Sequence, residues 1–137
     1  MICLDTNAVI AVLNETASRV EQQLRAALKG GHPIAISSLV LFELRYGAAK
    51  SARPERNAER IDEFLAAPIQ VLPFDGEDTR EAGEIRATLE RAGALIGPYD
   101  VLIAAQARRR GAALVTANAR EFARVPGLRV EDWASPA

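Results

Sequence analysis

Short apolar runs alternate with longer segments of helical periodicity along the chain. The runs at 2–5 and 33–36 are too short for a helix, and each is followed by polar residues of the kind that start one. In contrast, Ala82, Ile85 and Leu89 recur at helical spacing. The pattern predicts strands at 2–5, 33–36, 69–72, 113–117 and 128–132, and helices at 7–13, 18–29, 39–50, 55–66, 75–92 and 98–110.

Strands separated by helices favour a parallel sheet, because each crossover returns the chain to the same edge. We therefore predict an α/β fold, with three α/β/α layers and a mainly parallel sheet of four to five strands, in a single domain spanning 1–137. In such sheets the ligand site lies at the carboxyl ends of the strands. Asp5 ends the first strand, and the segment 116–121 follows the fourth.

Composition narrows the class of protein only slightly. The net charge of −1 does not indicate a general nucleic-acid binder, although only Lys29 and Lys50 are lysines among 17 basic residues. Cys3 is the single cysteine, so no disulfide within the chain is expected. No apolar stretch approaches the roughly 20 residues of a membrane span, and a cytoplasmic protein without a membrane partner is the expectation.

Three further acids, Glu43, Asp100 and Glu121, have positions that a structural role explains only in part. Glu43 shares a helix face with Leu39 and Val40, and Asp100 opens a helix that continues as VLIAA. A surface carboxylate and a helix-starting aspartate are the plain interpretations of these two. Glu121 follows Asn118 at capping-box spacing, which accounts for it equally well.

Taken together, the four acids indicate a metal site at one edge of the sheet. Crowded carboxylates repel one another unless a cation neutralises them. Oxygen ligands without His or Cys suit Mg²⁺ or Mn²⁺ better than zinc. Such an ion makes a bound water more acidic and stabilises a departing oxygen, which is the chemistry of phosphodiester hydrolysis.

Four fragments in order resemble the PIN domain, and specifically the VapC-type toxins of bacterial type II toxin–antitoxin systems. They are MICLDTN, SSLVLFELRYGA, IGPYDVLIAAQA and LVTANAREFARVPGLRVEDW, which together span almost the whole chain. The resemblance implies a Mg²⁺- or Mn²⁺-dependent endoribonuclease whose substrates include transfer RNA. It also implies a homodimer, inhibited by a cognate VapB-type antitoxin in a heterotetramer or larger complex.

The resemblance also implies roles for individual residues. Asp5, Glu43 and Asp100 match the metal-binding acids, and Glu121 matches a fourth catalytic acid less closely, because many PIN domains place that acid near the position of Asn118. Gln106 stands where many relatives carry histidine. The polar residues that match the motif and would support the carboxylates are Thr6, Asn7, Thr116 and Asn118.

Cations near the acids are needed to bring a phosphate to them. The candidate RNA-binding residues are Arg45, Lys50, Arg53, Arg56, Arg60, Arg108, Arg109 and Arg110, for which a solvated helix face is the plain alternative. We expect Phe42, Tyr46 and Trp133 to pack in the core. The helices at 18–29 and 39–66 are candidates for an antitoxin groove.

The alternative function is a PIN-like module that binds RNA or protein without cutting. Retention of all four acids favours cleavage. A haloacid dehalogenase phosphatase is excluded because position 7 is Asn where a second aspartate is needed, and a receiver domain because no lysine follows Lys50.

Overall fold

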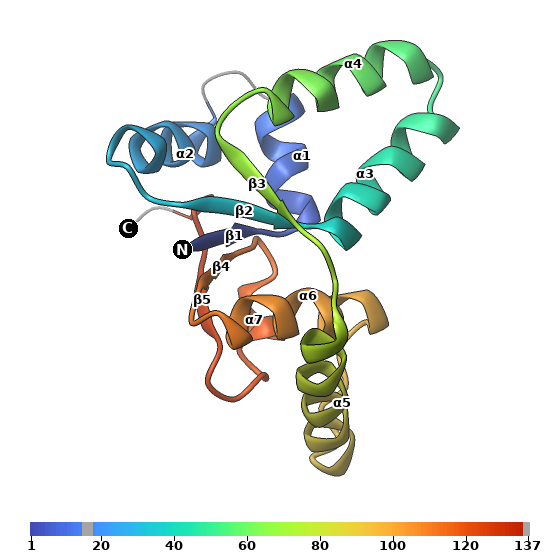
Figure 1. Ribbon diagram of the computed structural model, residues 1–137, viewed down its shortest axis with the longest axis vertical. Coiled ribbons are helices and arrows are strands. Elements are labelled where there is room, and N and C mark those ends of the chain that lie inside the picture. Colours follow the sequence, from blue (N-terminus) through green and yellow to red (C-terminus); the bar gives the residue numbers. More distant parts are fainter. Residues whose placement is uncertain (15–17, 136–137) are drawn as a thin grey trace.

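The computed structural model describes residues 1–14 and 18–135. Its strands form one sheet in the order β3-β2-β1-β4-β5, and every neighbouring pair is parallel (Figure 1). The predicted parallel α/β sheet is therefore confirmed. The strands are β1 (Ile2–Leu4), β2 (Ile34–Ser37), β3 (Ile69–Leu72), β4 (Ala113–Val115) and β5 (Arg129–Glu131).

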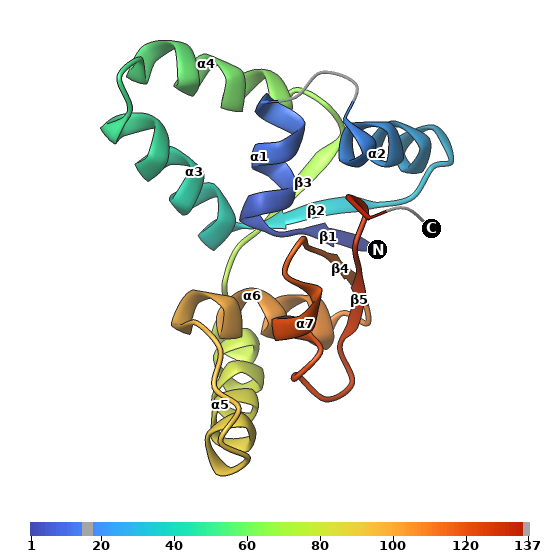
Figure 2. The same cartoon turned by 180° about the vertical axis from the view of Figure 1, so that it is seen from behind.

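Helices cover both faces of the sheet and complete the predicted three layers. Figures 1 and 2 show α1 to α4 on one side and α5 to α7 on the other. This division follows from right-handed crossovers, because the chain moves outward from β1 to β3 and then returns across the sheet to β4. The helices are α1 (Thr6–Asn14), α2 (Arg19–Lys29), α3 (Ser38–Lys50), α4 (Pro54–Leu65), α5 (Gly76–Arg91), α6 (Pro98–Arg109) and α7 (Ala119–Phe122).

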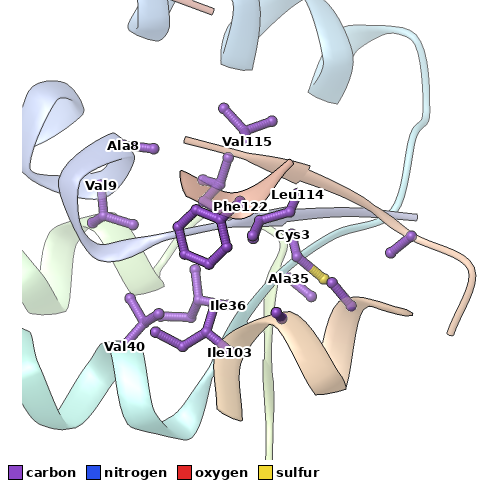
Figure 3. Packing of buried hydrophobic residues seen from close by; sticks show 14 of the residues in the cluster. Cys3, Ala8, Val9, Ala35, Ile36, Val40, Ile103, Leu114, Val115 and Phe122 are labelled. Carbon is purple, nitrogen blue, oxygen red and sulfur yellow. The ribbon is translucent and has the colours of Figure 1, made fainter. Parts of the chain in front are cut away.

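The core lies on both faces of the central strands. Leu114 of β4 is fully buried, and the same hydrophobic cluster includes Val9 and Val40 from one helical layer and Ile103 and Phe122 from the other (Figure 3). Burial on both faces explains why these strands read as continuous apolar runs rather than as alternating ones.

Local signals explain where several elements begin and end. The Ser37 hydroxyl accepts a hydrogen bond from the Leu39 N–H at 3.0 Å and caps α3, as its position before the helix predicts. Pro98 occupies the first turn of α6, where its missing N–H costs nothing. Gly93 follows α5 with a positive φ of 64°, a conformation that glycine adopts without strain.

Two of the three aromatic residues expected in the core are on the surface. Trp133 is buried as predicted, but 52% of Phe42 and 58% of Tyr46 are exposed. The prediction was wrong because α3 packs through Val40, Leu44 and Ala48, which leaves the aromatic residues on its outer face.

Within the part of the chain that the structure describes, no helix is long and apolar enough to cross a membrane.

Candidate active site

The carboxyl edge of the sheet has a topological switch point between β1 and β4. From β1 the chain moves to β2, whereas β4 lies on the other side of β1 and continues to β5. Crossovers leave this point on opposite faces, and open α/β sheets generally bind their ligands at such a point. Asp5 follows β1 and Thr116 follows β4, and the Asp5 N–H donates to the Val115 carbonyl at 3.0 Å.

Hydrogen bonds hold Asp5 in a fixed position at this edge of the sheet. Only 4% of the residue is exposed, and its Oδ1 accepts a hydrogen bond from the Ala8 N–H at 2.8 Å. The Thr116 side chain also hydrogen-bonds to it. The carboxylate therefore caps the first turn of α1 while it remains at the strand edge.

Glu43 reaches the same edge from α3. The Thr6 hydroxyl donates to Glu43 Oε1 at 2.7 Å, and this bond ties the start of α1 to the middle of α3. Glu43 is partly buried, whereas Asn7 is exposed on α1. Thr6 thus fixes the orientation of Glu43, and Asn7 faces solvent.

Asp100 and Glu121 approach from the other helical layer. Asp100 lies in the first turn of α6, and a Cβ at Gly97 would stand only 3.0 Å from Asp100 Oδ2. Glu121 Oε1 accepts from the Gly97 N–H at 3.1 Å, and its other oxygen accepts from the Asn118 side-chain amide. Glu121 therefore connects α7 to the start of α6, directly beside Asp100.

The capping box, which was the structural alternative for Glu121, does not form at α7. Asn118 is the N-cap residue but makes no side-chain bond to the helix backbone. Its N–H instead donates to the Thr116 hydroxyl at 2.9 Å, and its side chain holds Glu121. The role of Gly97 was not recognised in the sequence, although the Gly97–Pro98 pair is itself a helix-start signal.

The four carboxylates influence one another electrostatically. Burial, followed by the charges of Glu121, Glu43 and Asp5, raises the pKa of Asp100 to about 6. Burial also raises the pKa of Asp5, against the hydrogen bonds from Thr116 and Ala8, and the Glu43 charge adds to that rise. The structure thus brings all four predicted acids into one electrostatic cluster.

The acidic cluster is not neutralised by a basic side chain among the residues that the structure describes. Within residues 1–14 and 18–135, none of the four acids forms an ion pair with Lys or Arg. Gathered, partly buried carboxylates without a protein cation are suited to a hard divalent cation.

The carboxylates do not yet close around a single point. Among the described residues, no three Asp, Glu, His or Cys side chains are arranged to hold an ion as they stand. The donor set nevertheless fits Mg²⁺ or Mn²⁺ in its chemistry, since all its ligand atoms are carboxylate or hydroxyl oxygens.

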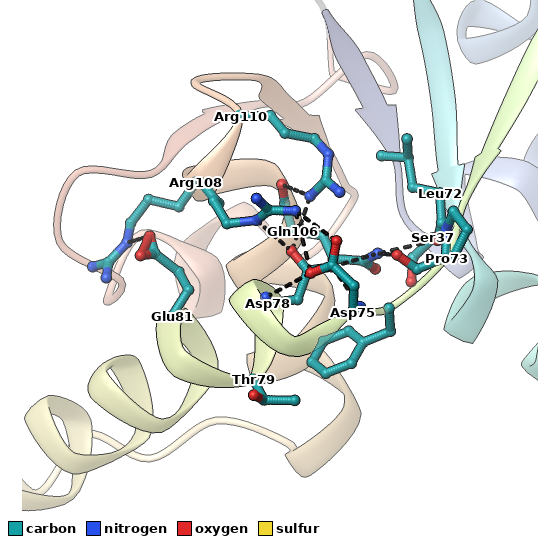
Figure 4. A network of polar contacts seen from close by, with 12 residues as sticks. Ser37, Leu72, Pro73, Asp75, Asp78, Thr79, Glu81, Gln106, Arg108 and Arg110 are labelled. Atoms are coloured by element: carbon teal, nitrogen blue, oxygen red, sulfur yellow. Dashed lines mark hydrogen bonds and ion pairs between the residues drawn. The ribbon is translucent and has the colours of Figure 1, made fainter.

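Three of the candidate RNA-binding arginines have structural partners instead. Arg108 pairs with Glu81 at 2.8 Å, and Arg109 and Arg110 both contact Asp78, at 2.7 and 3.1 Å (Figure 4). They lie at the C-terminal end of α6, whereas Asp100 lies in its first turn. Their charges hold α6 against α5, so we do not assign them to RNA.

Gln106 also has a structural role in this network. Its side-chain amide donates to the carbonyls of Leu72 and Pro73, at 3.0 and 3.2 Å, and so ties the middle of α6 to the end of β3 (Figure 4). It is buried and makes no contact with the acidic cluster in any of these bonds.

We expect the metal-free protein to lose stability as the pH rises. The pKa of Asp100 is raised from 3.8 to about 6, so folding favours the protonated acid. Its contribution is fully present below about pH 4 and is lost as the pH passes from 4 to 6, by on the order of 2 kcal/mol. Melting in EDTA should show this loss, and Asp100→Asn should reduce it; identical pH profiles would contradict the assignment.

Comparison with known proteins supports the resemblance found in the sequence. The family model described as "PIN domain" matches residues 2–128. The chain belongs to the PIN-domain family. A protein named tRNA(fMet)-specific endonuclease VapC from Shigella flexneri is 45% identical to this PIN domain over 131 residues, covering 96% of both chains. The protein of the same name from Salmonella typhimurium is 41% identical over 130 residues, covering 95% of this chain and 96% of the other.

Solved structures agree with these sequence relatives. A chain of VapBC2 from Rickettsia felis, bound to a DNA fragment from its promoter, matches this PIN domain with a TM-score of 0.91 and 40% identity, covering 97% of this chain and 99% of the other. A chain of DNA-bound VapBC from Salmonella typhimurium has a TM-score of 0.88 and 40% identity, covering 96% and 97%. The VapC-type identification made from four sequence fragments is confirmed.

Proposed function

We propose that this PIN domain is a Mg²⁺- or Mn²⁺-dependent endoribonuclease and the toxin of a VapBC-type pair. One observation carries the catalytic part of the proposal: four carboxylates from both helical layers meet at the switch point, and no ion pair with Lys or Arg neutralises them among the described residues. An endonuclease name on relatives over nearly the full chain supports the same reaction.

Each residue has a role that follows from its contacts. Asp5, Glu43 and Asp100 would hold the ion, which when bound supplies Lewis acidity toward the phosphodiester and makes a neighbouring water more acidic. Thr6 and Thr116 keep the carboxylates of Glu43 and Asp5 oriented through their hydroxyl groups.

Glu121 has a different role in this proposal. Two of its contacts, to Gly97 and Asn118, go to its two oxygens and fix the start of α6. We therefore assign it to positioning Asp100 and to the local negative charge. Asn118 supports Glu121, and Asn7, which is exposed beside the cluster, is left to contact the substrate.

The substrate class that the relatives suggest is transfer RNA. Both the Shigella and the Salmonella relatives are named for cleavage of tRNA(fMet), and the present chain is over 40% identical to each. Of the candidate cations, Arg45 and Lys50 lie exposed on α3, the helix that carries Glu43. Contacts from these cations to phosphates should make RNA binding fall steeply with salt.

The partner that the neighbours suggest is a VapB-type antitoxin acting in the cytoplasm, with this PIN domain as a homodimer. Both solved complexes are VapBC pairs. A groove of about 370 Å³ between α2 and α4 combines apolar side chains, among them Leu24, Leu28 and Phe64, with charged ones such as Arg25 and Arg60. It is therefore suited to an amphipathic helix. Both helices lie within the segments 18–29 and 39–66, which the sequence indicated as candidates for an antitoxin groove.

Metal removal tests the proposed reaction against the non-cleaving alternative. We expect the purified protein, freed of antitoxin, to cut a transfer RNA in Mg²⁺ or Mn²⁺ and to lose at least about 100-fold of that rate in EDTA. Excess Mg²⁺ should restore the rate, while Ca²⁺ serves as a control for non-specific charge screening. Binding without cleavage under every metal condition would favour the alternative module.

A further inference from the structure

Exposed aromatic rings lie directly beside the catalytic acids. Phe42 precedes Glu43 on α3, and Tyr99 precedes Asp100 on α6. Their exposed fractions are 52% and 46%, although rings of this size are usually largely buried. The two ring centroids are 6.1 Å apart, and the ring planes are tilted by 46°. A mutual contact between two half-exposed rings leaves an apolar aromatic surface open to a ligand.

The rings and the acids form two matched pairs across neighbouring helices. α3 packs against α6, and Figures 1 and 2 both show these helices close together where they begin, at the carboxyl edge of the sheet. The Glu43 charge contributes to the raised pKa of Asp100, so these two acids are close enough to interact across the same pair of helices. Phe42 and Tyr99 are therefore the exposed rings that are adjacent in sequence to Glu43 and Asp100 on these two helices.

Cations on the same helix show which kind of ligand fits this surface. The Lys50 ammonium lies 4.7 Å from the centre of the Tyr46 ring, one helical turn beyond Phe42. Arg45 is also exposed and forms a surface ion pair with Asp62 at 2.8 Å, a contact of small energetic value. Aromatic rings interleaved with cations bind a chain that carries both flat bases and phosphates.

We propose that Phe42 and Tyr99 form a stacking platform for an unpaired nucleobase next to the scissile phosphate. The inference rests on the proposed RNA cleavage for the identity of its ligand. Stacking of a base on an aromatic side chain strengthens binding and requires that the base has left its own helix. The platform selects loops and single strands over duplex RNA, with little preference for base identity.

The platform is tested by binding of a synthetic single-stranded RNA oligonucleotide in EDTA, where a metal-dependent enzyme leaves the RNA intact. One base is replaced by the fluorescent analogue 2-aminopurine, whose emission falls on stacking, and a second RNA carries an abasic ribose there. We expect wild-type protein to quench the analogue. The double variant Phe42→Leu/Tyr99→Leu should abolish the quenching and raise Kd for the intact RNA by about 10-fold or more, which corresponds to the loss of one stacked base.

Controls separate stacking from the loss of apolar surface. Leucine keeps the apolar character of both positions and removes the flat rings. The double variant Phe42→Trp/Tyr99→Phe keeps an aromatic ring at each position, so it should quench the analogue as wild type does. Leu95→Ala is the control, because it removes an exposed apolar side chain that lies before α6 and is not an aromatic ring, and Kd should stay within about twofold. The abasic RNA should bind wild type and the double variant with the same Kd.

Two results would overturn the platform. One is an unchanged Kd and unchanged quenching in the double variant. The other is an equal loss of affinity for intact and abasic RNA with a fall in molecular mass by light scattering, which would show that the rings join two copies of the chain. Cleavage in Mg²⁺ is measured separately. If the variants cut RNA but their binding is the same for intact and abasic RNA, the platform alone is rejected. If wild type quenches the analogue but cuts no RNA, the proposed reaction is rejected.

Discussion

Asp5→Asn is expected to lower RNA cleavage by at least about 100-fold while the protein keeps its fold. The substitution removes one negative charge from the cluster and leaves the side-chain volume nearly unchanged. Asparagine Oδ1 can still accept the hydrogen bond that the Ala8 N–H donates at 2.8 Å, so the start of α1 is preserved. The loss of rate thus follows from the missing charge and not from local unfolding.

Stability provides an independent readout of the same variant. Burial raises the pKa of Asp5, so the ionised carboxylate is disfavoured in the folded protein at neutral pH. The melting temperature of metal-free Asp5→Asn should therefore equal or exceed that of wild type at pH 7. Glu90→Gln, which changes an exposed acid on α5, is the matched control and should leave both cleavage and melting unchanged. Wild-type cleavage by Asp5→Asn would reject Asp5 as a catalytic residue.

Asp78→Ala is expected to destabilise the layer formed by α5 to α7 by about 3 kcal/mol, or a fall of roughly 10 °C in melting temperature. Asp78 has no exposed surface, contacts Arg109 and Arg110, and accepts from the Asp75 N–H in the capping box that begins α5 (Figure 4). Alanine would leave two partly buried guanidinium groups without their shared partner and would remove half of the cap.

Acid should weaken the same contact. Burial alone would raise the pKa of Asp78, but hydrogen bonds from the Asp75 N–H, Arg109 and Arg110 outweigh it and hold that pKa below its usual value. The stabilisation is therefore present at neutral pH and is lost as the pH falls through the folded-state pKa.

A matched control for Asp78 lies on the same helix. Glu84 contacts Arg108 at 3.2 Å with 68% of its side chain exposed, so Glu84→Ala should change the free energy of unfolding by about 0.5 kcal/mol or less. Chemical denaturation of both variants at pH 7 measures the difference. Equal stabilities for Asp78→Ala and Glu84→Ala would show that the buried network contributes nothing beyond a surface ion pair.

The sequence was sufficient to predict the layers, the parallel sheet and the edge at which the acids meet. Parallel strands bring all their carboxyl ends to one edge, so Asp5 and the residues after β4 were expected at the same edge. The structure adds that β1 and β4 are direct neighbours in the sheet. Periodicity could not reveal the outer face of α3, because Phe42 lies beside apolar positions that do enter the core.

Contacts between distant segments were also beyond reach. Glu121 and Asn118 have the spacing of a capping box. In the structure, however, Glu121 accepts its backbone hydrogen bond from the N–H of Gly97, which is 24 positions away in the sequence. Likewise, Arg109 resembles a solvated cation until α5 is packed against α6, where it meets the buried Asp78. The local sequence shows where polar side chains lie along each helix, but tertiary packing determines which partner each of them contacts.

Binding of Mn²⁺ in the absence of RNA tests the central claim most directly, because the claim is that carboxylates at the switch point hold a divalent cation. Mn²⁺ would be titrated into wild type, Asp5→Asn and the control Glu90→Gln, and the electron paramagnetic resonance signal would measure the Mn²⁺ that remains free. We predict that wild type and Glu90→Gln bind Mn²⁺ with equal affinity, that Mg²⁺ displaces it, and that Asp5→Asn binds at least about 10-fold more weakly. Equal Mn²⁺ affinity in Asp5→Asn would contradict the account.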